Sequence, residues 1–221
     1  MGDILSTQEL IKLCCMIIAL LISIIGHEIM HGLVAYHYGD SSAKDAKRLS
    51  PNPLRHIDLF GSIILPGVLY LTQAPFLFGW AKPVPVDIEH IIRTRGFSAA
   101  TGVALAGVAY NLALAFACSL VLTSGIIELD SNAGAIATLL LLYLVQYNIL
   151  LFVFNLLPIP PLDGSRALLF VALKFGWLKL ARLLESIAPF GIFIIFILLF
   201  IPGLSRILFY PVTMLLQFLL G

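Results

Sequence analysis

Residues 13–36 read LCCMIIALLISIIGHEIMHGLVAY, and this stretch decides the fold because it predicts a transmembrane helix with a polar motif inside it. A helix needs about 20 apolar residues to cross a bilayer, so the stretch is long enough. Its one charged side chain belongs to Glu28, within the pattern His27-Glu28-Ile29-Met30-His31. An uncompensated acid at the bilayer centre costs about 2.5–3.5 kcal/mol on insertion scales, so Glu28 indicates a functional site.

The motif H-E-x-x-H has the spacing of a metal site. His27 and His31 are four residues apart, which places them on one helix face with Cβ atoms about 6 Å from each other. This spacing suits two ligands of one Zn²⁺ ion, and Glu28 beside them can take a proton from water. The pattern also arises by chance, so a metal site requires a third ligand.

Composition predicts a membrane protein. The 221 residues are 60% hydrophobic and 11% charged, whereas a soluble domain carries about 25% charge. We therefore expect an all-α polytopic membrane protein whose partner is the lipid bilayer. The net charge of +1 argues against a nucleic-acid surface, and nothing in the sequence indicates an oligomeric state.

Uncharged stretches predict the spans. Three core transmembrane helices are expected within residues 13–36, 96–127 and 131–162, and one or two C-terminal helices within 186–205 and 207–221. The number of C-terminal helices is open because a Pro-Gly pair lies between the last two stretches. The chain is expected to be a single domain over residues 1–221, with its core at 8–175 and anchoring helices at 186–221.

The distribution of Lys and Arg predicts the orientation. Basic residues mark three segments as cytoplasmic and their absence marks one as external: 38–56, 79–95 and 164–185, against 126–133. Segments 38–56 and 79–95 share a side, so residues 59–81 should form a re-entrant hairpin that turns at Pro66-Gly67. An ordinary crossing is the alternative.

Residues 79–86 read GWAKPVPV and leave this hairpin. Two prolines at positions i and i+2 exclude a helix. They favour a short extended edge on which Lys82, Val84 and Val86 offer their backbone groups to one side. A polyproline-like connector is the alternative.

Asp163 is the strongest third ligand. It follows the rigid approach NLLPIPPL at residues 155–162, and Gly164 lets the backbone turn tightly after it. Two crossings after the first helix return the chain to the membrane half that holds His27 and His31. Asp163 could instead cap the helix expected after Gly164.

The other histidines fit a metal site less well. His37 lies about 9 Å further along an unbroken helix than His31, so it cannot reach the same ion. His56 and His90 lie near charged segments and are expected to be solvated.

Taken together, H-E-x-x-H on a first helix and NLLPIPPLDG on a later one resemble the site-2 proteases, a family of intramembrane zinc metalloproteases. The stretches RLSPNPLRHID at 48–58 and GWAKPVPV at 79–86 are similar to those of small prokaryotic members that lack PDZ and CBS domains. The resemblance covers residues 20–170, and it is carried most specifically by the two metal motifs.

The resemblance implies one Zn²⁺ per chain, held by His27, His31 and Asp163, with Glu28 as the general base. It also implies an endopeptidase that cuts the transmembrane segment of a membrane-protein substrate. The protein is then an integral multi-pass protein of a prokaryotic cell membrane, with its active site toward the cytoplasmic side.

Five further residues are expected to bind substrate. Lys82, Val84 and Val86 would accept an unwound substrate segment as an added strand. Asn155 would donate to the substrate backbone or to the oxyanion, or else cap its helix. Asn111 would contact substrate, or else make an interhelical hydrogen bond.

Two other functional classes remain open from the sequence. A metal transporter or channel could use the same donors as a transit site, although such a pathway favours repeated ligands and the sequence holds one cluster. An inactive relative that binds membrane helices would usually lack the glutamate or a ligand, and here none is missing.

Overall fold

The computed structural model describes residues 6–72, 81–127 and 131–221, and in these ranges it is helical without any strand. Five helical stretches in the described part are long and apolar enough to cross a membrane: Thr7–His37, Phe97–Thr123, Asn132–Asn155, Leu178–Phe200 and Gly203–Leu220. The expectation of an all-α polytopic membrane protein is confirmed.

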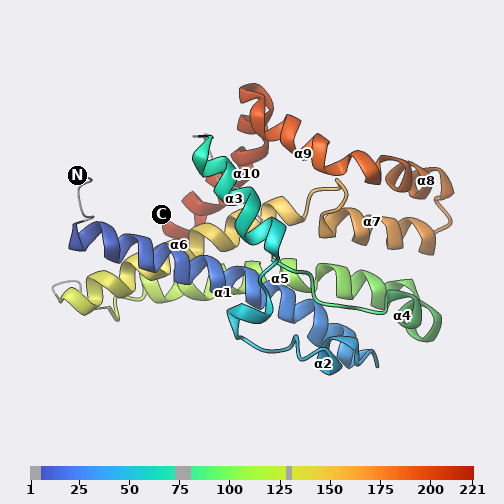
Figure 1. Ribbon diagram of the computed structural model, residues 1–221, viewed down its shortest axis with the longest axis horizontal. Coiled ribbons are helices and arrows are strands. Elements are labelled where there is room, and N and C mark those ends of the chain that lie inside the picture. Colours follow the sequence, from blue (N-terminus) through green and yellow to red (C-terminus); the bar gives the residue numbers. More distant parts are fainter. Residues whose placement is uncertain (1–5, 73–80, 128–130) are drawn as a thin grey trace.

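Three long helices form the centre of the molecule: α1 (Thr7–His37), α5 (Phe97–Thr123) and α6 (Asn132–Asn155). They lie side by side along the long axis (Figure 1). Buried small residues such as Ala19 and Ala115 let the backbones approach closely, as is usual between membrane helices. Side chains that α1 directs toward α5 and α6 are therefore enclosed between the helices.

The segment after α1 continues through four short helices: α2 (Ser42–Asp45), η1 (Pro53–Arg55), η2 (Leu59–Ile64) and α3 (Leu65–Leu71). The Lys82 N–H donates to the His56 carbonyl over 2.9 Å. The two ends of the segment between them therefore meet, so it leaves and returns on the same side. The contact therefore argues against a single crossing, and entry of the segment into a membrane stays a prediction.

The turn expected at Pro66-Gly67 is wrong. The chain is helical through both residues, from η2 into α3. Pro66 is the second residue of α3, just after η2 passes into it without a break. The return from α3 falls on residues 73–80, outside the described residues.

Residues 81–87 then run outside any helix toward α4 (Ile88–Arg95), and they pair with no strand in the described part of the chain. The Asp87 side chain caps α4 by accepting from the His90 N–H. Gly96, with φ +80°, makes the left-handed turn from α4 into α5. The predicted extended edge is therefore a connector that belongs to no strand and lies along the bundle.

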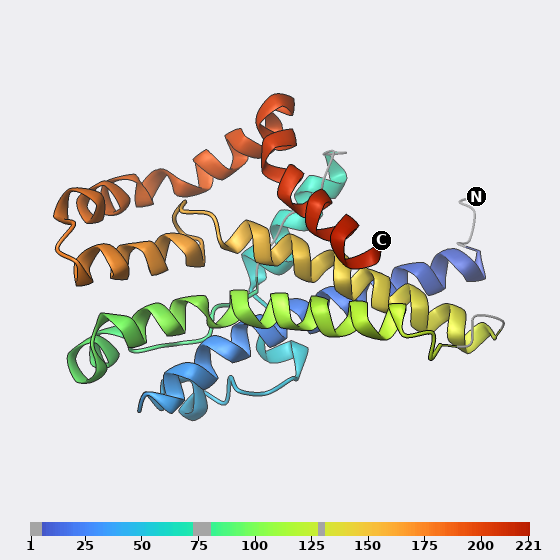
Figure 2. The ribbon, with the colours of Figure 1, turned by 180° about the vertical axis from the view of Figure 1, so that it is seen from behind.

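The C-terminal part holds four α-helices and a short 3-10 turn: α7 (Asp163–Lys174), α8 (Leu178–Ile187), η3 (Ala188–Phe190), α9 (Gly191–Phe200) and α10 (Pro202–Leu220). Helix α7 packs on α5, and α10 crosses α6 (Figure 2). The apolar stretch begins at Leu178 rather than at 186. The charged residues of α8 lie on one helix face, and they interrupted the uncharged stretch from which the start of this span was predicted.

Two glycines hold the proline-rich loop between α6 and α7. A Cβ added at Gly164 would collide with the Leu156 carbonyl, and one at Gly191 would collide with the Pro160 carbonyl. The loop is therefore enclosed between the starts of α7 and α9, and this fixes the position of Asp163.

Candidate metal centre

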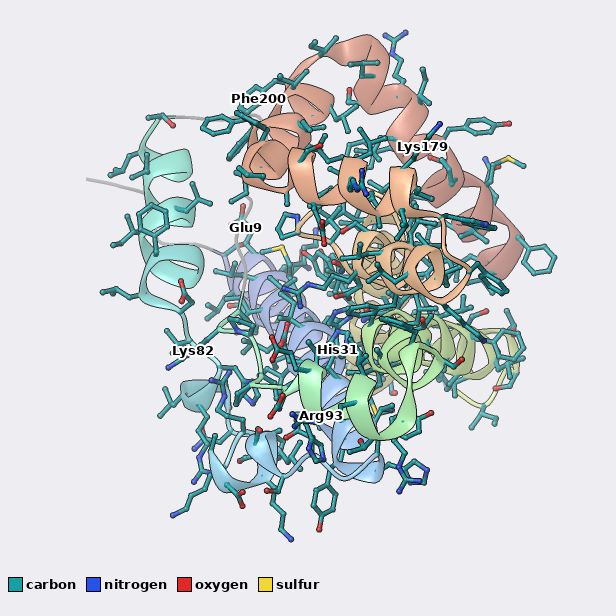
Figure 3. All side chains as sticks on the ribbon, turned by 90° about the vertical axis from the view of Figure 1, so that its right-hand side faces the viewer. Glu9, His31, Lys82, Arg93, Lys179 and Phe200 are labelled. Atoms are coloured by element: carbon teal, nitrogen blue, oxygen red, sulfur yellow. The ribbon has the colours of Figure 1, made fainter. Side chains whose placement is uncertain are left out.

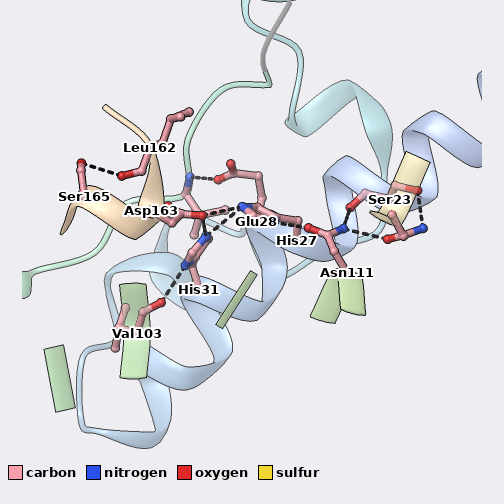
Figure 4. A network of polar contacts seen from close by, with 11 residues as sticks. Ser23, His27, Glu28, His31, Val103, Asn111, Leu162, Asp163 and Ser165 are labelled. Carbon is pink, nitrogen blue, oxygen red and sulfur yellow. Dashed lines mark hydrogen bonds and ion pairs between the residues drawn. The ribbon is translucent and has the colours of Figure 1, made fainter. Parts of the chain in front are cut away.

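Three side chains converge inside the bundle. His27 and His31 project from one face of α1, and Asp163 is the first residue of α7. The two histidine Nε2 atoms are 3.1 Å apart, and Asp163 Oδ2 lies 3.0 Å from that of His27 and 3.3 Å from that of His31 (Figure 4). In the end-on view of Figure 3, His31 lies near the middle of the helices.

The Nδ1 atoms of both histidines are occupied. His27 Nδ1 lies 2.6 Å from Asn111 Oδ1, and His31 Nδ1 lies 2.7 Å from the Val103 carbonyl oxygen. Oxygens of this kind only accept, so each Nδ1 carries the hydrogen. With the hydrogen on Nδ1, the neutral form of each ring carries its lone pair on Nε2, on the side of Asp163, and this is the tautomer that a metal requires.

These three donors fit a zinc ion. Ligands about 2.0–2.1 Å from zinc at tetrahedral angles lie roughly 3.3 Å apart, close to the separations found. Asp163 Oδ2 is a buried atom without a hydrogen-bond partner, although it lies near both rings. Two Nε2 atoms and a carboxylate oxygen that face one point form a donor set that suits a divalent cation. Two histidines and one carboxylate also leave a fourth position open.

Helix α5 makes room for this arrangement. A Cβ at Gly107 would lie 2.5 Å from Cε1 of His27, so the ring packs directly on the glycine. One turn later, Asn111 binds Nδ1 of the same ring. In the sequence, Gly107 lies four residues before Asn111, a spacing that predicts close helix packing, but the contact with the ring of His27 was not predicted.

Glu28 lies beside the three donors and is held by the connector. Its Oε2 accepts a hydrogen bond of 2.9 Å from the Val84 N–H. Val84 is buried, and its side chain packs against Gly32 on α1. The carboxylate is therefore anchored next to the metal donors by the same segment that the sequence singled out.

Besides the Val84 N–H, both backbone groups of Lys82 on the proposed strand edge are already in hydrogen bonds. The Lys82 N–H donates to the carbonyl of His56, and the Lys82 carbonyl accepts from Arg48 over 2.5 Å. Val86 packs its side chain against the buried cluster of α1, α4 and α5. A substrate strand therefore has to exchange partners here rather than find a free edge.

Asn111 differs from the expectation that it contacts substrate. It is fully buried, and its amide bonds to His27, to Asn148 and to the Ser23 carbonyl. The alternative prediction, an interhelical hydrogen bond, is confirmed. Asn155 ends α6 at the start of the loop that leads to Asp163, where it is half-buried.

The remaining histidines stay outside the donor group, which among the described residues consists of His27, His31 and Asp163. His37 ends α1. The expectation that His56 is solvated is wrong: it is 2% exposed, and its Nε2 lies 2.8 Å from the Ser50 carbonyl. The returning chain at Lys82 bonds to it and covers it.

The fold and the site define a multi-pass membrane protein in which an H-E-x-x-H motif and an aspartate form a possible metal-binding group among the helices. The chain is 32% identical over 211 residues to a protein of Bacillus subtilis (strain 168) named "Putative zinc metalloprotease YwhC". The match covers 89% of this chain and 84% of that protein, so the chain belongs to the family of that metalloprotease. No family model and no solved structure matches it significantly.

Proposed function

We propose that this protein is a zinc-dependent intramembrane endopeptidase of the site-2 type, which cleaves a transmembrane segment of a membrane-protein substrate. One observation carries the proposal: two histidines and a carboxylate from α1 and α7 meet inside a bundle of apolar helices, with Glu28 beside them. Hydrolysis at this position acts on a peptide that is itself in the membrane.

The chemistry needs a Lewis acid and a general base. Zn²⁺, when bound, supplies the Lewis acid that polarises a carbonyl and brings the pKa of water near 7. The Glu28 carboxylate accepts the proton of the attacking water and returns it to the leaving amine nitrogen. Its position next to His27 in the chain keeps the base beside the three donors.

Substrate is proposed to bind along the connector at residues 81–87. A helical substrate hides its carbonyls, so its segment must unwind before attack. A substrate carbonyl then replaces Glu28 as the acceptor of the Val84 N–H, and this exchange frees the carboxylate for proton transfer. Asn155, at the end of α6, is proposed to donate to the bound peptide or to the oxyanion.

The proposed location is a prokaryotic cell membrane, with the site in its cytoplasmic half. The segments rich in Lys and Arg lie toward the end of the molecule that holds α4 and α7, which supports a cytoplasmic location for that end (Figure 1). Water reaches the donors from that nearby surface.

Replacement of Glu28 by Gln tests the proposal. Glu28→Gln should retain zinc and lose cleavage by about 10²–10⁴-fold, the usual contribution of a general base. Single-pass membrane proteins that accumulate in cells with Glu28→Gln, measured by quantitative proteomics, are the substrates. Glu89→Gln, an exposed acid in α4, is the matched control and should change nothing.

The same variant separates the other functional classes. Altered metal flux in Glu28→Gln vesicles, with no accumulating membrane protein, would identify a transporter. Unchanged cellular behaviour of Glu28→Gln would identify a binding protein without catalysis. Either result would refute the protease.

A further inference from the structure

A chain of buried polar side chains leads from the metal centre into the membrane-spanning part of the bundle. Ser23 on α1, Asn111 on α5 and Asn148 on α6 are each fully buried. They form hydrogen bonds with one another, and Asn111 continues the chain to His27 (Figure 4). Polar groups at this depth are costly when unpaired, so a network of three helices needs a reason.

At the end of the network far from His27, the side-chain amide of Asn148 can have only one orientation. Asn148 lies 2.8 Å from the Leu144 carbonyl and 2.7 Å from Ser23 Oγ. A carbonyl only accepts, so the NH₂ group of Asn148 must face it. Ser23 accepts the second N–H of that group and gives its own hydrogen to the Ala19 carbonyl over 2.7 Å. The oxygen of Asn148 is therefore turned toward Asn111.

The orientation of the Asn148 amide determines that of Asn111, at the end of the network near His27. Asn148 Oδ1 lies 2.7 Å from Asn111, so Asn111 must present its NH₂ group there, with its second hydrogen directed to the Ser23 carbonyl at 3.3 Å. The oxygen of Asn111 is left facing His27, and it accepts the Nδ1 hydrogen. Each N–H and O–H in the network has an acceptor. Reversal of Asn148 would place its NH₂ group against that of Asn111, and reversal of Asn111 would place its oxygen against that of Asn148.

We propose that Asn148 is a positioning residue of the metal centre. It acts through Asn111, whose amide it holds with the oxygen toward His27, and so keeps the Nε2 lone pair of His27 available for metal. The inference rests on the proposed metal site. Asn148 touches neither metal nor substrate, and its effect is transmitted across two helix interfaces.

The alternative role for Asn148 is helix packing alone. In that case its loss would lower stability, as loss of any buried side chain does, without a specific effect on metal. Ile149, its neighbour in α6, is equally buried and packs in the apolar cluster. The two residues therefore offer a matched pair, one inside the network and one outside it.

The test measures zinc on the purified full-length protein in detergent. Asn148→Leu should weaken zinc affinity by about tenfold or more, the range for outer partners of metal-bound histidines, when zinc competes with a chromophoric chelator. The visible spectrum of the Co²⁺-loaded variant should also differ from that of the wild type. Ile149→Ala should lower the melting temperature and leave both metal readouts unchanged.

Ser23→Ala provides a milder variant if Asn148→Leu does not fold. It removes one acceptor of Asn148 but leaves the Leu144 carbonyl to orient the amide, so a smaller loss of zinc affinity is expected. If the folded variant had the zinc affinity and the Co²⁺ spectrum of the wild type, the proposed role of Asn148 would be refuted, but the metal site would not. A wild-type protein without stoichiometric zinc would overturn the metal site as well.

Discussion

The two metal-facing histidines share one helix face, but they are held by different kinds of group. His27 binds a side-chain amide, which is itself oriented by a second amide on a third helix. His31 binds the backbone carbonyl of Val103 on α5. A carbonyl of the chain can only accept, whereas an amide side chain can turn around, so one partner needs an orienting network and the other does not.

This difference indicates which substitutions should lower the metal affinity of the site. The position of His27 depends on the identity of side chains in α5 and α6, and any one of them can be lost by substitution. The position of His31 depends on the packing of α1 against α5, which many residues share. We therefore expect metal affinity to be sensitive around His27 and tolerant around His31.

The largest effect is expected at Gly107. In Gly107→Ala the new Cβ would meet the ring of His27 at 2.5 Å, and a displaced ligand should weaken zinc beyond the roughly 10–100-fold typical of outer partners. Gly102→Ala is the control on the same helix, since its Cβ meets only the Tyr38 ring edge and hydroxyl, at 3.5 Å or more. Equal zinc affinities in a chelator competition would contradict the packing argument.

Removal of the amide that holds His27 is expected to come next. Asn111→Leu leaves the Nδ1 hydrogen of His27 and the oxygen of Asn148 unpaired, at about 1–3 kcal/mol each. Zinc affinity should fall by about 10–100-fold, and the melting temperature should fall with it. A folded Asn111→Leu protein with wild-type zinc affinity would show that the amide does not orient the ring.

An intermediate effect is expected on the other side of the site. Val84→Pro removes the N–H that holds Glu28, so cleavage should fall by about tenfold or more, within the range for a misplaced general base. Zinc content should stay unchanged, because no metal donor is touched. Val84→Ala retains the N–H and is the control. Undiminished cleavage by Val84→Pro would remove both the anchoring of Glu28 and the strand exchange.

The difference between the two histidines predicts that substitution of Val103 leaves the zinc affinity almost unchanged. Val103→Ala keeps the carbonyl that binds His31, so zinc affinity should stay within about twofold, far from the 10–100-fold expected for a lost partner. The melting temperature should drop, because Val103 is buried. A large loss of zinc affinity in this variant would mean that the two histidines are equally vulnerable.

The smallest effect is expected at Asp40, outside the spans. Burial alone would raise its pKa, but hydrogen bonds from Ser42 and from the Asp87 N–H hold the pKa of Asp40 below its ordinary value. Its stabilising effect is therefore complete above the ordinary carboxyl pKa and disappears as the pH falls through the lowered value. The melting temperature of wild type should exceed that of Asp40→Asn near pH 7, and the gap should close in acid. A constant gap would contradict this.

Much of the fold was readable from one sequence because a bilayer imposes simple rules. Uncharged stretches predicted α1, α5 and α6, and the positions of Lys and Arg predicted that residues 59–81 return to their starting side. The turn predicted at Pro66-Gly67 was wrong, because a Pro-Gly pair occurs in helices as well as in turns and the sequence alone does not distinguish the two. The start of α8 was concealed by charges on one face.

The donor set was equally accessible for a chemical reason. His27, Glu28, His31 and Asp163 are residue types that apolar helices rarely hold, so their presence alone drew attention to them. Val84 was singled out as part of an edge, but its hydrogen bond to Glu28 depends on how the connector lies against α1. The burial of His56 likewise depends on the returning chain.

Periodicity and residue chemistry were sufficient for the spans, the motif and the nature of the ligands, because each is a local property of the chain. The direction of the amide network, the packing of His27 on Gly107 and the capture of Glu28 by Val84 are not local. Each joins helices far apart in sequence, and hydrogen-bond polarity and contact distance exist only once those helices have packed.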